Sequence, residues 1–260
     1  MMNNFKRIIY CLYFMENNFY LSRNFKLQKV GNLDWLNNNF GFGLSTASVD
    51  ELMIILVKKN PEYKDFIDYF KIVEKLRKNI FIPITLGGGI SSYEISKSFF
   101  DSGADKILIN SNVYKTSNLI EKISNYYGSQ SISVGVDYKK NMEKIELYSQ
   151  CGTKLEEVKF SDHLKNLEKM NCGEIILNSI NNDGNGAGLD LDITKIINKN
   201  YNKPLLLMGG AGKPEHFAQG LKINYISGVV SANLFNFLGS GLNSVRTKLV
   251  EDGINIAKFD

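Results

Sequence analysis

Cysteine and histidine are scarce in this sequence. Its 260 residues include three cysteines, Cys11, Cys151 and Cys172, which are odd in number and far apart. This set fits neither a disulfide framework nor the close cysteine pairs of a zinc site, so we expect a reducing, cytoplasmic setting. The only histidines, His163 and His216, lack a second ligand at metal spacing. We interpret both as surface or packing residues and expect no metal and no other cofactor.

Long runs of charge and of apolar residues are also missing. The net charge is +4 and the Lys and Arg residues are scattered, so we expect no nucleic-acid partner. The apolar run at residues 8–15 follows Lys6 and Arg7, as in a signal peptide, but the next residues, ENNF, offer no small-residue cleavage site. We interpret this run as a buried strand. No run is long enough to span a bilayer, and we expect no membrane partner.

Apolar side chains are abundant enough for one sizeable core. Hydrophobic residues make up 43% of the chain and charged residues 22%. A chain of this length lies within the range of a single α/β barrel. We therefore expect one domain spanning residues 1–260.

Short apolar runs alternate with amphipathic segments along the whole chain. The runs are continuous, as in parallel strands that are buried on both faces. Residues 62–78 place Phe66, Phe70 and Val73 at helical spacing, and residues 91–100 and 118–127 have similar patterns. The predicted strands are Arg7–Leu12, Glu51–Leu56, Phe81–Leu86, Lys106–Asn110, Ser131–Val136, Glu174–Asn178, Pro204–Met208 and Ile226–Ser231.

The two halves of the chain repeat each other. The segment TLGGGI at residues 85–90 returns as LMGGAG at 207–212, so that Gly87 and Gly209 are 122 residues apart. Glu51 and Glu174 begin equivalent strands 123 residues apart. Eight strand-then-helix units built as two tandem half-barrels predict an α/β fold of the (β/α)₈ or TIM-barrel type. The competing architecture, a doubly wound open sheet, does not explain this repeat.

Glycine-rich turns follow the third and seventh predicted strands. Such turns let the backbone approach a phosphate, whose charge is met by exposed N–H groups at a helix start. The alternative is that the glycines only permit tight turns. Because the motif recurs in both halves, we predict two phosphate sites and a ligand phosphorylated at both ends or a phosphosugar. The predicted residues are Gly88, Gly89, Asn110 and Ser111 in one half, and Gly184, Gly210, Gly212, Ala232 and Asn233 in the other.

Asp137 closes the apolar run SVGVD at the end of the fifth predicted strand. A half-buried carboxylate at the catalytic rim of a barrel can act as a general acid or base. The alternative is a loop or helix-capping carboxylate. Asp183, in the segment SINNDGNGAG, is more ambiguous, because that segment could be an ordinary polar loop.

Eight ordered motifs resemble a known family. They read KRIIYCL, VDEL, ITLGGGI, GADKILINSNV, YGSQSISVGVD, GEIILNSINNDG, GGAGKPEHF and SANLFNF, and span nearly the whole chain. Together they resemble the cyclase subunit of imidazole glycerol phosphate synthase, an enzyme of histidine biosynthesis. The resemblance implies a barrel that receives ammonia from a glutaminase subunit. The barrel then uses it to cleave and cyclise a bisphosphorylated ribonucleotide.

The resemblance also implies two catalytic aspartates, one at the end of strand one and one at the end of strand five. Asp137 matches the second, but Tyr13 takes the place of the first. A phenol with an ordinary pKa of about 10 is no base near neutral pH without a large shift, and losing one member of an acid/base pair removes roughly 10²- to 10⁴-fold in rate. Other polar rim positions of the family, including that of a phosphate-contacting lysine, also differ. They are occupied here by Leu21, Leu56, Asn178 and Asn181.

A ring of charges at the strand starts agrees with the family. In the family these residues form a gate through which ammonia enters the barrel, and they match Arg7, Glu51, Lys106 and Glu174. Asp105 matches a position that faces the glutaminase. The alternative is that these charges are ordinary solvated caps.

The combination of a matching gate and a missing aspartate resembles a branch of the family that serves glycosyl amidation of surface polysaccharides. The stretch NFKLQKVG at residues 24–31 resembles the loop of that branch. There, the glutaminase and the barrel are thought to supply ammonia to a separate sugar amidotransferase. We expect this role, with a histidine-pathway cyclase subunit as the alternative. A third reading is a barrel that has lost both activities and serves as an assembly or phosphosugar-binding module.

Overall fold

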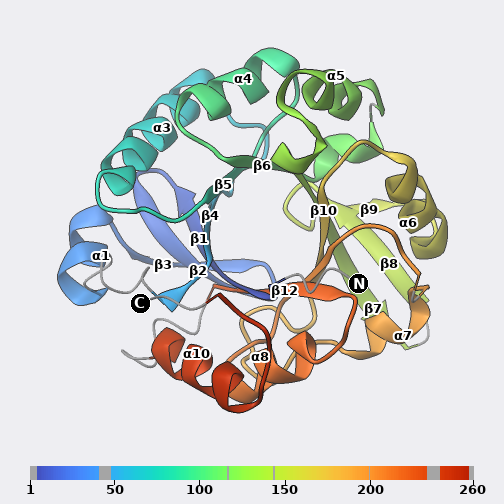
Figure 1. Cartoon of the computed structure of the whole chain (residues 1–260). Helices are drawn as coiled ribbons and strands as arrows, with labels where there is room; N and C mark the ends of the chain where they lie inside the picture. The colour runs from blue at the N-terminus through green and yellow to red at the C-terminus, as the bar shows by residue number, and fades with distance from the viewer. Residues whose placement is uncertain are drawn as a thin grey trace.

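Eight parallel strands close on themselves in the computed structural model, which describes residues 5–40, 48–115, 117–142, 144–198, 200–232 and 241–257. The strand order is β10–β11–β12–β1–β4–β5–β6–β7, and β7 pairs back to β10. This closure confirms the predicted (β/α)₈ barrel, seen nearly along its axis in Figure 1. The strands are β1 (Arg7–Met15), β4 (Glu51–Leu56), β5 (Ile84–Gly87), β6 (Lys106–Ile109), β7 (Ile132–Asn141), β10 (Glu174–Ser179), β11 (Leu205–Met208) and β12 (Ile226–Ser231).

Strand β1 illustrates why the strands are apolar on both faces. Successive side chains of a strand point to opposite sides. Ile9 and Cys11 belong to the cluster that fills the barrel interior. Ile8 and Tyr10 belong to the larger cluster between the barrel and its helices. Both faces are therefore buried, and no polar alternation remains in the sequence.

Helices form the outer ring in Figure 1. In α3, Tyr69 and Val73 are fully buried toward the barrel, and Asp65 accepts a hydrogen bond from the Glu62 amide at the helix start. The helices are α1 (Leu33–Phe40), α3 (Tyr63–Arg77), α4 (Tyr93–Asp101), α5 (Ser117–Tyr127), α6 (Phe160–Lys169), α7 (Asp192–Ile196), α8 (Pro214–Leu221) and α10 (Gly241–Glu251), with the short 3₁₀ helices η2 (Ser111–Tyr114) and η3 (Ser129–Ser131).

The third strand begins later than predicted. We expected it to start at Phe81, but β5 starts at Ile84 and Phe81 is 96% exposed. Pro83 lies between them and has no amide hydrogen to donate to the sheet, so regular pairing begins after it. Its carbonyl still accepts a bond from Leu52.

Two hairpins extend the sheet beyond the barrel, and sequence reasoning missed both. Strand β1 continues into β2 (Asn18–Arg23) and β3 (Lys26–Gly31), and β7 continues into β8 (Lys144–Ser149) and β9 (Lys154–Glu156). They follow the first strand of each half-barrel and so extend the internal repeat. The turn between β1 and β2 uses Glu16 and Asn17 at φ 50° and 60°, where glycine is usual. A search for Asn-Gly or Asp-Gly turns therefore fails here.

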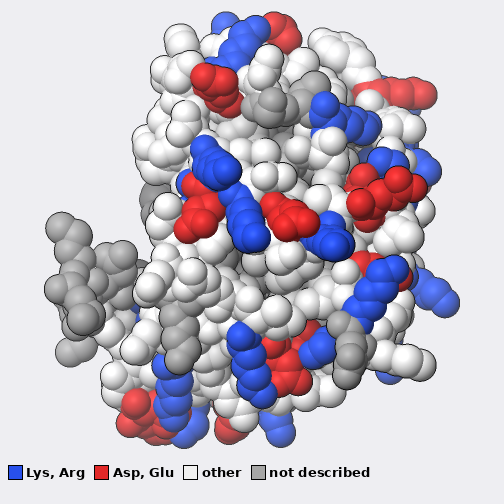
Figure 2. All heavy atoms as spheres, turned by 90° about the vertical axis from the view of Figure 1, so that its right-hand side faces the viewer, with Lys and Arg blue, Asp and Glu red and all other residues white. Residues whose placement is uncertain are grey.

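The outer surface mixes both signs of charge. Figure 2 shows Lys and Arg side chains interspersed with Asp and Glu over the face at the right of Figure 1, where α6 lies. No large field of one sign is visible on this face. Among the described residues, no helix is long and apolar enough to cross a membrane.

Candidate active site

Asp137 lies near the carboxyl end of β7, where the barrel opens, and only 8% of it is exposed. Asn110 Nδ2 donates to its Oδ2 at 2.7 Å, and Asn178 Nδ2 donates to its Oδ1 at 2.9 Å. Burial raises the pKa of Asp137 to about 7, although the two amide hydrogen bonds oppose the shift, and the nearby charge of Asp183 adds to it. Close to neutral pH, Asp137 can therefore either accept or donate a proton.

The two asparagines can serve both protonation states of Asp137. Their side-chain oxygens are buried and have no hydrogen-bond partner within the described residues. A half-turn of either amide would direct its oxygen toward a protonated Asp137, whose O–H would then donate. The pair thus holds the carboxyl group in place without fixing its charge.

Tyr13 lies at the same mouth, on β1, and is 6% exposed. It packs in the interior cluster with Cys11 and Met208. Burial raises its pKa well above the ordinary value, and the neighbouring Cys11, Asp183 and Asp137 add to the shift. This shift is opposite to the one that a tyrosine base would need. Tyr13 therefore remains a neutral phenol.

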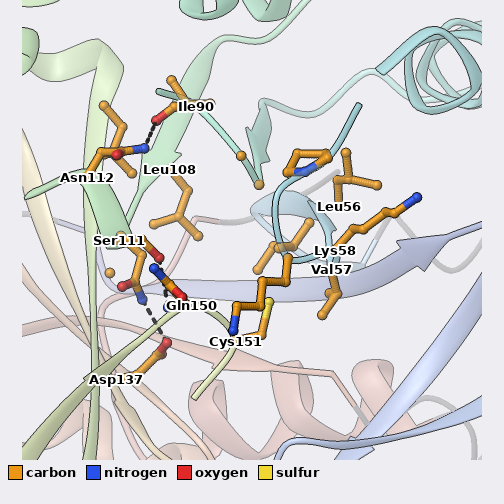
Figure 3. A pocket seen from close by; sticks show the side chains of 18 of the residues that line it. Leu56, Val57, Lys58, Ile90, Leu108, Ser111, Asn112, Asp137, Gln150 and Cys151 are labelled. Carbon is orange, nitrogen blue, oxygen red and sulfur yellow. Dashed lines mark hydrogen bonds between the residues drawn. The ribbon is translucent and has the colours of Figure 1, made fainter. Parts of the chain in front are cut away.

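Two cavities open at the barrel mouth, and Tyr13 and Met208 line both. The first, of about 420 Å³, lies over β4 to β7, and its wall combines Leu56 and Val57 with Ser111, Gln150 and Cys151, as Figure 3 shows. Gly88, Gly89, Asn110 and Ser111, predicted to bind one phosphate, all line this cavity. The second, of about 300 Å³, brings together Gly184, Gly210, Gly212 and Ala232. Asn233 lies outside the described residues.

The backbone geometry explains two of the glycines directly. Gly88 has φ +109°, and a Cβ there would lie 2.2 Å from the Leu56 carbonyl oxygen. Gly210 has φ +97°, and its Cβ would lie 2.0 Å from the Gly188 carbonyl oxygen. These turns need glycine whether or not a phosphate binds, so the tight-turn alternative and phosphate binding are compatible.

Some of the groups predicted to bind phosphate already have partners. The Gly212 amide donates to Nδ1 of His216 at 3.1 Å, and Ser111 Oγ accepts from the Gln150 amide at 2.9 Å. The Gly212 amide would have to leave His216 to donate to a ligand, whereas the Ser111 hydroxyl accepts here and can still donate its own proton.

At the opposite end of the barrel, four charged side chains form a closed ring. Arg7 donates to Glu51 Oε2 at 3.0 Å and to Glu174 Oε2 at 2.6 Å. Lys106 Nζ lies 2.8 Å from Glu51 Oε2 and 3.2 Å from Glu174 Oε1. Each cation thus bridges both carboxylates. The sequence-predicted gate residues therefore meet in one ring, although each begins a different strand.

The ring is buried as well as paired. Glu51 is 2% exposed and Glu174 5%, and Ser133 Oγ donates to Glu174 Oε1 at 2.6 Å. Burial alone would raise the pKa of Glu174, but the charges of Arg7 and Lys106 outweigh it and hold the pKa below the ordinary value. Solvated caps would lie in water without such contacts, so this alternative does not describe the ring.

Asp105 lies beside the ring and is exposed. Its Oδ2 accepts a hydrogen bond from the Ile84 amide at 2.8 Å, which secures the start of β5. The residue therefore has a structural task in addition to any contact with a partner.

Known proteins are similar in sequence to this chain over most of its length. Residues 47–239 match the family model described as histidine biosynthesis protein. The chain is 36% identical over 241 residues to a putative imidazole glycerol phosphate synthase subunit hisF2 of Parasynechococcus marenigrum (strain WH8102), covering 93% of this chain and 89% of the relative. The chain belongs to the HisF family.

Other HisF proteins match over similar lengths. The imidazole glycerol phosphate synthase subunit HisF of Natranaerobius thermophilus is 34% identical over 80% of this chain and 82% of its own. The subunit HisF of Chlorobium phaeobacteroides (strain BS1) is 30% identical over 96% of this chain and 98% of its own. These names agree with the family expected from the motifs. They give no support to the glycosyl amidation branch.

In this HisF-family chain, sequence reasoning left Asp183 undecided, and the structure gives it a defined place. Its Oδ2 accepts from Ser22 Oγ at 2.5 Å and from the Phe25 amide at 2.9 Å, so it anchors the β2–β3 hairpin over the mouth. Asn24 adds two bonds from its side-chain amide, to the carbonyls of Ile180 and Asn181. The sequence could not show this, because Ser22 and Asp183 lie 161 residues apart.

The other polar rim positions are also placed. Leu56 is 3% exposed in the wall of the first cavity, and Leu21 is part of β2. Asn181 Oδ1 accepts from the Lys140 amide at 2.8 Å and so ties β7 to the loop after β10. Asn178 is one of the two partners of Asp137.

The histidines are packing residues in this structure. The ring of His163 stacks on Tyr114 with centroids 4.5 Å apart, and burial lowers its pKa to about 4. His216 is 6% exposed and accepts from Gly212. Within the described ranges, no three His, Cys, Asp or Glu side chains are grouped as a metal site would require.

Proposed function

We propose that this HisF-family chain is the ammonia-receiving barrel subunit of a glutamine-dependent complex, with a glutaminase subunit as its partner. The observation that carries the proposal is that the ring of Arg7, Glu51, Lys106 and Glu174 and the carboxyl group of Asp137 lie at opposite ends of one barrel interior. Ammonia made by the partner would enter at the ring and reach the mouth, where a phosphorylated ligand is held.

The interior between the two ends suits a neutral molecule. It is lined by apolar side chains, among them Ile9, Met53 and Val230. An ammonium ion would lose its hydration there at high cost, whereas ammonia carries no charge to desolvate. The ring is closed in this structure, so passage requires at least one of its ion pairs to open.

At the mouth, Asp137 would exchange a proton with the ligand or with the arriving ammonia. The names of the relatives support the histidine-pathway reaction, in which a cyclase needs both an acid and a base. Tyr13 supplies neither a carboxylate nor an accessible phenolate. We therefore propose a cyclase subunit with a turnover well below that of a chain with two carboxylates.

One observation favours a second candidate function. If the tyrosine at position 13 abolishes cyclisation altogether, the barrel would only conduct ammonia to another enzyme, such as an amidotransferase acting on a surface-glycan sugar. The comparisons support this role less than the histidine-pathway role. The intact ring together with Tyr13 is its only structural support.

The decisive experiment separates conduction from chemistry. The purified barrel would be mixed with the glutaminase subunit of an imidazole glycerol phosphate synthase, and glutamine hydrolysis and cyclase turnover would be measured in the same tube. A parallel assay with ammonium salts and no glutaminase tests the mouth alone, so a weak partner interface cannot imitate an inactive site.

The outcomes divide the candidates clearly. Stimulated glutamine hydrolysis with measurable cyclisation supports the cyclase subunit, and stimulation without cyclisation in either assay supports the conduit. No complex and no stimulation would refute the proposal. Asp105→Asn, which keeps the side-chain shape, should weaken the complex if Asp105 faces the partner. The exposed Asp101→Asn is its control.

A further inference from the structure

The second cavity has one described cation in its wall. Arg23, the last residue of β2, lines it together with the turn at Gly184 and Gly186 and the turn at Gly210 and Gly212. Arg23 is exposed, and no ion pair or side-chain hydrogen bond involves it within the described residues. Its guanidinium is therefore available to a ligand.

The two faces of the β2–β3 hairpin serve different cavities. Ser22 and its cross-strand partner Leu27 line the first cavity, whereas Arg23 lines the second. This division follows from the alternation of side chains along a strand. Leu21 is on the same face of β2 as Arg23, two residues earlier, and Arg23 is the residue of the hairpin that brings a positive charge to the second cavity.

The hairpin tip is held rigidly against the loop that forms the opposite wall. The Asn24 amide donates to the Asp183 carbonyl at 3.0 Å, and the Phe25 amide donates to Asp183 Oδ2 at 2.9 Å. Asn24 Nδ2 adds bonds to Ile180 and Asn181 at 3.1 and 2.9 Å. The backbone beside Arg23 is thus positioned before any ligand arrives, which lowers the entropy lost on binding.

The charges in the wall of the second cavity make Arg23 important for binding an anion. Asp183 is the acidic side chain among the described lining residues, and a carboxylate there repels an anion. Burial raises the pKa of Asp183, and its bonds from Ser22 and Phe25 oppose the shift. The Gly212 amide is already bonded to His216. The remaining backbone N–H groups therefore need a positive side chain to attract a dianion.

We propose that Arg23 is the specificity-determining cation of the second cavity, where its guanidinium binds the phosphate of a phosphomonoester ligand against the glycine turns. The planar guanidinium can donate two parallel hydrogen bonds to one phosphate. The inference rests on the proposed function only in taking the mouth as the site of a phosphorylated ligand.

The test is a titration with inorganic phosphate, followed through the backbone amide signals of ¹⁵N-glycine-labelled protein. Gly184, Gly186 and Gly210 report on the second cavity, and Gly88 and Gly89 on the first. We expect Arg23→Gln to weaken phosphate binding at the second cavity by about tenfold or more, because a charged hydrogen bond is lost. Binding at the first cavity should not change. Arg23→Lys should recover part of the affinity.

Lys26→Gln is the matched control. Lys26 pairs with Arg23 across the hairpin and is exposed, but does not line the cavity. Equal losses in Lys26→Gln and Arg23→Gln would reduce the effect to general electrostatics and overturn the proposal. Unchanged hydrogen exchange of the Phe25 amide in Arg23→Gln would show that the hairpin stays anchored. Faster hydrogen exchange of the Phe25 amide would show that the hairpin has loosened. The loss of phosphate binding would then not be explained by direct contact with Arg23, and the proposal would be overturned.

Two further outcomes separate this inference from the proposed function. If phosphate shifts the second-cavity glycines equally in wild type and Arg23→Gln, the phosphate site stands and the role of Arg23 is refuted. If wild type shows no phosphate at that cavity, the Arg23 inference fails. Stimulation of the glutaminase, measured separately, would still decide the ammonia-receiving function.

Discussion

Asn178 donates its side-chain amide to Oδ1 of Asp137 at 2.9 Å, while its own side-chain oxygen has no partner among the described residues. The Asn178 amide can therefore reverse when Asp137 gains a proton. This relationship joins β7 and β10, two adjacent parallel strands that are consecutive in the barrel, with Asn178 directly opposite Asp137. Burial raises the pKa of Asp137, and this hydrogen bond opposes the shift.

We expect Asp137→Asn to stabilise the protein at pH 8. The folded pKa of Asp137 is about 7, above the ordinary value of about 3.9, so the folded state holds this proton more tightly than the unfolded state. Its contribution to stability is full below about pH 4 and is lost as the pH rises through about 7. The substituted amide needs no proton, and a reversed Asn178 amide can accept a hydrogen bond from it.

Thermal unfolding at pH 5 and pH 8 would check this expectation. The melting temperature of Asp137→Asn should exceed that of wild type at pH 8, and the difference should shrink at pH 5. Asp101→Asn, at an exposed carboxylate, should show no such dependence. A constant or reversed difference for Asp137→Asn would contradict the raised pKa.

We expect Tyr13→Asp to increase cyclase turnover with ammonium salts. The variant would place a second carboxylate near Asp137, and like charges at close range drive two pKa values apart, which yields one acid and one base. The wild-type rate should lie roughly 10²- to 10⁴-fold below that of a cyclase with both carboxylates. Recovery should be partial, because Leu21 and Leu56 also change the mouth.

Steady-state assays of wild type, Tyr13→Asp and the double variant with Asp137→Asn would test this. Asp137→Asn alone should lower the small wild-type rate only slightly, since the catalytic pair is already incomplete. Wild-type turnover equal to that of an ordinary cyclase and abolished by Asp137→Asn would show that Tyr13 is no obstacle.

We expect Arg7→Met to destabilise the fold by about 3–5 kcal/mol. Without Arg7, the buried carboxylates of Glu51 and Glu174 would share only Lys106. Urea unfolding at pH 7 measures the change. Lys195→Met is the control, because its ion pair with Asp192 is exposed and screened by water, so its loss should change the stability far less. Similar losses in both variants would mean that the ring is not a buried network.

The same ring predicts a second pH dependence. The folded pKa of Glu174 is lowered by Arg7 and Lys106 against the effect of burial. Its contribution is therefore present above its ordinary pKa of about 4.3 and is lost as the pH falls through the lower folded value. Wild type should lose stability on acidification below about pH 4. Glu174→Gln should lose less over this range.

We expect Gly210→Ala to be much more damaging than Gly253→Ala. Both glycines have positive φ, +97° and +68°, so both variants carry backbone strain of about 1–2 kcal/mol. A Cβ at Gly210 would in addition meet the Gly188 carbonyl at 2.0 Å, whereas nothing lies within 4 Å of one at Gly253. The difference between the unfolding free energies of the two variants measures the effect of the close contact, because the backbone strain is common to both. Equal losses would show that the turn can move aside.

The sequence alone determined the barrel and the members of the ring. Continuous apolar runs at regular spacing indicate parallel strands, since a strand buried on both faces has no place for polar residues. Strand starts and ends also assign residues to opposite ends of a barrel. Arg7 and Glu174 could therefore be assigned to one end, and Tyr13 and Asp137 to the other, before any contact was known.

Tertiary structure decided the contacts and the electrostatics. The hairpin anchor between Ser22 and Asp183 joins residues 161 apart in the chain, and its turns use non-glycine residues at positive φ. No local pattern encodes such a pairing, because it depends on which loops the closed barrel brings together. The raised pKa of Asp137 likewise comes from burial and is opposed by hydrogen bonds from Asn178 on β10 and from Asn110, which directly follows β6. Sequence supplies the carboxylate, but only the folded environment sets its affinity for a proton.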